Sequence, residues 1–240
     1  MTKRRTVIAA LAALAVTRRI KAAELTWQEM LSDAVSLKNP VTLGVRLPPP
    51  DSDLWEDAQA QLDEAVKKKA PFEIARYFVD SLPAKFQTAW PQPNPANPTL
   101  ANPLIVLFFL STHTVPVGDT TAWYAAFMNW CLGHSDPLVK GTSSASSQSF
   151  LGWGRPVWNK GDAWPPVKAK AGDVAVFTHK TDPAHGHVSF YSAPTLRQPK
   201  HVDVMGGNQF NSKQLHTFNV KSLNIESELE LKTIRTAMLS

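Results

Sequence analysis

Apolar residues in the first third of the chain recur three or four positions apart, the spacing of one face of an α-helix. This spacing predicts helices at about 27–35, 54–66 and 71–79. Asp51 or Ser52 is suited to cap the second helix, and Pro71 is suited to open the third. Residues 91–99 contain four prolines, which remove backbone donors and fix φ, so we expect a linker there.

The pattern changes after residue 100. Residues 104–110 and 120–132 are strongly apolar and predict two buried helices. Four short runs rich in β-branched and aromatic residues follow, separated by Gly, Asp, Pro and Asn, and predict strands at 174–178, 187–192, 201–205 and 215–220. Helices followed by an antiparallel sheet predict the α+β class.

The N-terminus has the pattern of an export leader. Three basic residues, at positions 3–5, precede an apolar run at 6–16 that is too short to span a bilayer, and Ala22-Ala23 offers small residues for cleavage. We therefore predict a leader at 1–23 and a periplasmic or extracellular protein without a stable membrane span. The alternative is an amphipathic helix on a cytoplasmic protein. The remaining chain divides into a helical region at 24–90, the linker at 91–99 and a domain at 100–240.

Composition excludes several classes of protein. Hydrophobic residues at 43% and charged residues at 19% are typical of a globular chain with a core. Six of the 25 basic residues lie within 1–23, and the 19 that remain face 20 acids, so no basic surface for nucleic acid is expected. Cys131 is the single cysteine, which excludes an internal disulfide.

Five sequence blocks occur in a fixed order between residues 100 and 210. The blocks are Asn-Pro at 102–103, Thr-Ala-Trp-Tyr-Ala-Ala-Phe-Met-Asn-Trp at 121–130, the Gly-Thr-Ser-Ser-Ala loop at 141–154, Ala-Gly-Asp-Val-Ala-Val-Phe at 171–177 and Gly-His-Val-Ser-Phe-Tyr at 186–191, closed downstream by Gly-Gly-Asn-Gln at 206–209. Together they resemble the motifs of the NlpC/CHAP family, bacterial and phage cell-wall cysteine hydrolases with a papain-like fold. The segment 121–130 resembles that family's Trp-Cys-Ala-Ala-Phe-Val-Asn-Trp, and 186–191 resembles Gly-His-Val-Gly-Phe-Tyr.

The resemblance implies positions for the catalytic groups. Tyr124 stands where the family has its cysteine nucleophile, His187 stands at the base, and Asn208, or alternatively Gln209, stands at the group that orients the histidine. Near a helix N-terminus, the helix dipole and unpaired N–H groups favour a thiolate. A nearby histidine would then take the proton and return it to the leaving amine.

Tyr124 departs from the family at the reacting atom. A phenol with a pKa of about 10 is a poor nucleophile at neutral pH, and it is bulkier than a thiol. Cys131 lies seven residues later, about 10 Å along a helix axis, so a base placed for residue 124 would not reach it. We expect Cys131 to pack as a small hydrophobic residue, and we interpret the chain as a hydrolase lineage with weak or lost catalysis.

Other side chains are candidates for ligand contact. We assign substrate contact to Trp123, Trp153 and Ser189. Trp153, Trp158 and Trp164 are candidates to line a glycan groove, with packing in a core as the alternative. His185 and His187 share a strand face, but no third metal ligand has suitable spacing, and we expect neither a metal nor a cofactor.

Three functions are compatible with these observations. The first is a member of the peptidoglycan amidase or endopeptidase lineage that acts on or binds stem peptides. The second is a non-catalytic cell-wall-binding or interaction module. The third is a structural component of a phage-derived or secretion apparatus, with residues 24–90 contacting a protein partner.

Overall fold

The computed structural model describes residues 47–48, 51–90, 101–114, 116, 118–119, 121–195 and 198–238. All of them belong to one compact unit. The predicted leader at 1–23, the helix expected at 27–35 and the linker at 91–99 lie outside the described residues.

Two helices open the described chain, and both confirm the predicted spacing. Helix α3 spans Asp53–Val66, and Ser52 caps it by accepting a hydrogen bond from the backbone N–H of Leu54. Helix α4 spans Pro71–Asp80, with the proline in its first turn. Each helix buries one apolar face, which includes Trp55 in α3 and Phe78 in α4.

The buried helices after residue 100 gather around one aromatic cluster. Helix α5 (Pro103–Leu107) continues into the 3₁₀ helix η2 (Phe108–Ser111), and helix α6 spans Tyr124–Gly133. The ring of Phe78 from α4 meets the rings of Phe108 and Phe127 edge to face, with ring centroids 5.4 Å apart in each pair. Residues on both sides of the predicted linker therefore share this core. The other rings of the cluster are Trp123, Trp130 and Phe218.

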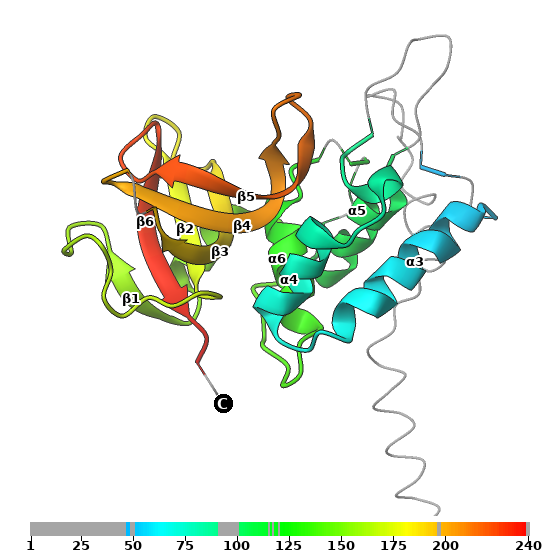
Figure 1. The fold of residues 1–240 in the computed structure, drawn as a ribbon, viewed down its shortest axis with the longest axis horizontal. Coiled ribbons are helices and arrows are strands. Elements are labelled where there is room, and N and C mark those ends of the chain that lie inside the picture. The colour runs from blue at the N-terminus through cyan, green and yellow to red at the C-terminus, as the bar shows by residue number, and fades with distance from the viewer. Residues whose placement is uncertain are drawn as a thin grey trace, which may run out of the picture. The chain divides into compact units, whose positions relative to one another are not determined.

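Six antiparallel strands form one sheet, in the order β1-β6-β2-β3-β4-β5. Helices α3 to α6 lie to one side of the strands in Figure 1, with α4 and α6 nearest to them. The strands are β1 (Arg155–Asn159), β2 (Val174–His179), β3 (Gly186–Pro194), β4 (His201–Phe210), β5 (His216–Asn224) and β6 (Leu229–Thr236). Mixed helix and antiparallel sheet confirm the α+β class. A separate core of the sheet contains Phe177, Tyr191 and Val204.

The element boundaries differ from the sequence prediction in two places. Helix α6 begins at Tyr124 rather than near residue 120, and its N-cap residue, Trp123, makes no side-chain capping bond. Strands β1 and β6 were not predicted. Within the described part of the chain, no helix combines the length and apolar character needed to cross a membrane.

Candidate functional site

The start of helix α6 positions Tyr124. The phenol belongs to the first residue of the helix, where backbone N–H groups lack intrahelical partners and the helix dipole is positive. Burial raises the pKa of Tyr124, and a side-chain hydrogen bond with Ser147 offsets part of that rise. The phenol is therefore neutral at physiological pH and is not activated as a nucleophile.

Strand β3 brings His187 to the same place. The two rings meet edge to face, with their centroids 5.2 Å apart and their planes at 79°. Within the described residues, no hydrogen bond joins the Tyr124 hydroxyl to His187. The pair that the motif order predicts is thus in contact, but as packed rings rather than as a nucleophile bonded to its base.

His187 is buried and neutral. Burial lowers its pKa to about 4, and the nearby positive charge of Lys221 acts in the same direction. A histidine with this pKa carries no positive charge at pH 7, and it accepts a proton weakly.

A chain of hydrogen bonds leads from His187 into the sheet. The Oγ of Ser189 lies 2.6 Å from His187 Nε2, and the side-chain amide of Gln209 donates to the same Oγ at 3.2 Å. Gln209, which the sequence offered as the alternative orienting group, therefore reaches His187 through Ser189. Asn208 has a φ of 60° in a β-bulge of β4, is half-buried, and has no hydrogen bond to His187 among the described residues.

Two glycines make room for this arrangement. A Cβ on Gly206 would lie 2.5 Å from the Ser189 Oγ, and a Cβ on Gly207 would overlap the ring of Trp123. The Gly-Gly pair thus allows β4 to approach the buried hydroxyl and the start of α6 at the same point. The bulge between Gly206 and Gln209 then turns Gln209 inward, where it is buried.

The 3₁₀ helix η3, Ser147–Gly152, borders the site next to α6 and the sheet. The amide of Gln148 donates to the Phe177 carbonyl at 2.9 Å and accepts from the Thr178 hydroxyl at 2.6 Å, which fastens η3 to β2. Ser147 is thereby held beside Tyr124. The sequence did not single out Ser147, because five serines occur between 143 and 149 and nothing distinguishes one of them.

Two buried polar residues hold the surrounding loops. The Oδ1 of Asn129 in α6 accepts from the backbone N–H groups of Thr142 at 2.6 Å and Ser143 at 2.9 Å. The Oδ2 of Asp119 accepts from the N–H groups of Trp90 at 2.8 Å and Asn102 at 2.7 Å. The first two bonds give a structural reason for the Asn in 121–130, and a Cβ at Gly141 would lie 2.2 Å from the same Oδ1. The side chain of Asn102 caps α5 by accepting from the N–H of Leu104 at 3.1 Å.

The four tryptophans considered for ligand contact lie in different places. Trp123 is fully buried and packs on Phe218, with ring centroids 4.8 Å apart, so its ring belongs to the core. Trp158 is buried in the sheet core and packs against Trp164. Trp153 is half-buried and donates from its ring nitrogen to the Lys140 carbonyl at 2.8 Å. It lines a hollow of about 240 Å³ that also includes Lys140 and Met238 but not Tyr124 or His187.

Cys131 is fully buried near the C-terminal end of α6. Burial raises the pKa of its thiol well above the usual value. The thiol is therefore protonated and out of reach of a substrate, as expected for a residue that packs as a hydrophobic group.

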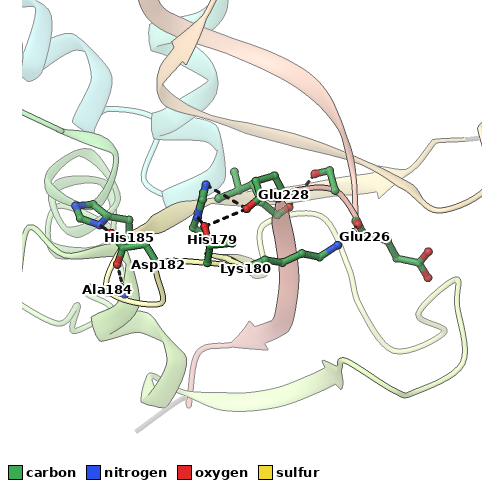
Figure 2. A network of polar contacts seen from close by, with 10 residues as sticks. His179, Lys180, Asp182, Ala184, His185, Glu226 and Glu228 are labelled. Atoms are coloured by element: carbon green, nitrogen blue, oxygen red, sulfur yellow. Dashed lines mark hydrogen bonds and ion pairs between the residues drawn. The ribbon is translucent and has the colours of Figure 1, made fainter.

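His185 and His187 do not form a pair. His185 lies in the β2–β3 turn and hydrogen bonds to Asp182 of the same turn at 2.6 Å (Figure 2). His179, the last residue of β2, lies 3.6 Å from Glu228 of the β5–β6 turn, and this surface contact joins the end of β2 to that turn. No group of three His, Cys, Asp or Glu side chains with metal-binding geometry occurs among the described residues.

No protein-family model matches this chain, and neither the curated proteins nor the solved structures give a significant match.

Proposed function

We propose that this chain is a non-hydrolytic member of the NlpC/CHAP lineage, with a papain-like fold, that binds the stem peptides of peptidoglycan. The observation that carries the proposal is the placement of Tyr124. A neutral phenol occupies the first residue of a helix whose start faces a strand histidine, which is where a thiol nucleophile of this lineage would stand.

The chemistry of the surrounding groups supports binding over cleavage. A buried histidine with a pKa of about 4 is a weak general base, and the only thiol among the described residues is buried elsewhere. Phenol, imidazole and hydroxyl groups instead offer hydrogen bonds to the carbonyl and N–H groups of a peptide. The ligand lies outside the cytoplasm, so the proposal also requires export, as the predicted leader at 1–23 implies.

The test combines retention and turnover on one substrate. The full chain is mixed with purified peptidoglycan, the pellet is assayed for bound protein, and the supernatant is assayed for released muropeptides by chromatography and mass spectrometry. We expect retention without release. Release above the blank would contradict the loss of catalysis, and absence of retention would contradict the assigned ligand.

Two variants make the retention specific to the site. Tyr124→Ala removes the phenol that faces His187 and is expected to reduce retention about tenfold, the loss of roughly one good contact. Lys168→Ala changes an exposed loop residue and is expected to leave retention unchanged. Equal retention of all three proteins would place the binding surface elsewhere.

A further inference from the structure

The hydrogen bonds around Ser189 determine where its proton goes. Ser189 is fully buried, and its Oγ contacts two nitrogens, Nε2 of His187 and the amide nitrogen of Gln209. An amide NH₂ group only donates, so the Ser189 oxygen accepts from Gln209. Among the described residues, the hydroxyl proton then has one acceptor within reach, the Nε2 of His187 at 2.6 Å.

This direction of donation determines the form of the imidazole. A ring nitrogen that accepts a hydrogen bond carries no proton, and a neutral imidazole carries its single proton on the other nitrogen. His187 is neutral because burial and the charge of Lys221 both lower its pKa. The proton of His187 therefore lies on Nδ1, and Nδ1 is the only ring nitrogen left for residue 124 or for a ligand.

We infer that Ser189 is a positioning residue that holds His187 as the neutral, Nδ1-protonated tautomer, so that the ring presents a donor and no basic nitrogen. The acceptor that fits this donor is a peptide carbonyl or carboxylate oxygen. The assignment of that ligand rests on the proposed function, whereas the tautomer itself does not. In a hydrolase the requirement is opposite, since the nitrogen facing the nucleophile has to be free to accept its proton.

The fold maintains this arrangement from both neighbouring strands. On β4, glycine at 206 leaves space for the Ser189 hydroxyl, and the bulge that follows turns Gln209 toward it. On β2, Ala175 lies opposite Ser189 and has no polar side-chain group that could compete for its proton. The Oε1 of Gln209 is buried and has no hydrogen-bond partner in the part of the chain that the structure describes. If the amide were reversed, Oε1 would offer an acceptor to the Ser189 hydroxyl. The orientation of the Gln209 amide therefore decides whether Ser189 donates to His187 or to Gln209.

The tautomer is measurable directly. Long-range ¹⁵N–¹H correlation spectra distinguish the two protonation states of each imidazole, and the seven histidines are resolved by comparing the wild type with His187→Gln. At pH 7 we expect His187 of the full chain to carry its proton on Nδ1. A proton on Nε2 in the wild type would overturn the inference.

Two variants test the roles of Ser189 and Gln209. Ser189→Ala removes the donor to Nε2, so the Nε2–H form is expected to gain population and the pKa of His187 to rise by about one unit. Gln209→Glu replaces the amide donor by a carboxylate acceptor. Ser189 would then donate to residue 209 and accept from His187, so the His187 proton is expected on Nε2. An unchanged tautomer in a folded Ser189→Ala or Gln209→Glu protein would also overturn the inference.

A matched control separates the loss of the hydrogen bond to His187 from a general loss of protein stability. Ser135→Ala removes a buried hydroxyl at the far end of α6 and is expected to lower stability without moving the His187 signals. If Ser189→Ala does not fold, the wild type and Gln209→Glu still decide between the two tautomers. None of these spectra depends on peptidoglycan, so failure of the inference is distinguishable from failure of the proposed function.

Discussion

At the scale of single residues, His187 makes the stability of the fold depend on pH. Its pKa is about 4 in the folded protein and about 6.5 in an unfolded chain, so between these values the unfolded state binds more protons. The stability that the neutral His187 contributes to the folded state is therefore fully present above pH 6.5 and is lost as the pH falls toward 4. The difference corresponds to on the order of 3 kcal/mol.

The measurement is urea unfolding at pH 7 and at pH 4.5. Wild type is expected to lose more stability over this range than His187→Gln, which lacks the titrating imidazole at position 187. His113→Gln, at an exposed histidine, serves as the control and should follow the wild type. Parallel losses in wild type and His187→Gln would show that burial does not lower the pKa of His187.

Tyr124 and Ser189 are expected to block catalysis separately. Tyr124→Cys restores a thiol, but a histidine with its proton on Nδ1 and its Nε2 bonded to Ser189 cannot accept the thiol proton. Tyr124→Cys/Ser189→Ala should therefore release muropeptides at least about tenfold faster than Tyr124→Cys, since a positioned base contributes on the order of 10²–10⁴-fold. Ser189→Ala alone lacks a nucleophile and should release none. Equal rates for the single and double variants would remove Ser189 from this role.

At the scale of elements, the contact between β4 and the start of α6 leaves no space for a side chain at residue 207. Gly207→Ala would force a Cβ into the ring of Trp123 and is expected to destabilise the protein by about 1–3 kcal/mol. Gly152→Ala adds a Cβ that meets no described atom within 4 Å and is expected to leave stability nearly unchanged. Denaturant midpoints of the two variants make the comparison, and equal midpoints would show that β4 can move away from α6.

The elements also show what the sequence can and cannot predict. Helix α4 and strand β3 carry local patterns, a periodic apolar face and a run of strand residues, and both were found. Strand β1 was missed because it is mostly exposed and contains Pro156. Strand β6 was missed because a register shift in its pairing with β2 interrupts the apolar–polar alternation.

In the site, too, some residues follow from local sequence patterns and others do not. Tyr124 and His187 follow from motif order, and the structure brings their rings into contact. The link from Gln209 through Ser189 to His187 depends on a bulge that forms only when β4 pairs with β5. No local pattern in the sequence indicates that pairing.

At the scale of the whole molecule, the helices before residue 90 are part of the core that supports α6. Phe78 of α4 is fully buried and meets Phe108, Phe127, Trp130 and Phe218. A fragment of residues 101–240 would expose this cluster to water. We expect the fragment to lack a cooperative unfolding transition, and Phe78→Ala in the full chain to lose about 3–5 kcal/mol.

Calorimetry and near-ultraviolet circular dichroism make this measurement. Phe72→Ala is a useful comparison, because that ring is half-buried and its loss should cost less than the loss of Phe78. A fragment that unfolds cooperatively with aromatic signals like those of the full chain would show that residues 101–240 form an independent domain.

The complete burial of Cys131 has a practical consequence for following this molecule in solution. Because the chain has no other thiol, the rate at which a thiol reagent labels the native protein reports how often the interior around α6 opens. A ligand held against α6 should slow that labelling. The labelling rate of Cys131 therefore measures how often the native protein opens around α6. In Tyr124→Cys, a second and faster labelling phase would measure how often the thiol at position 124 is accessible to the reagent.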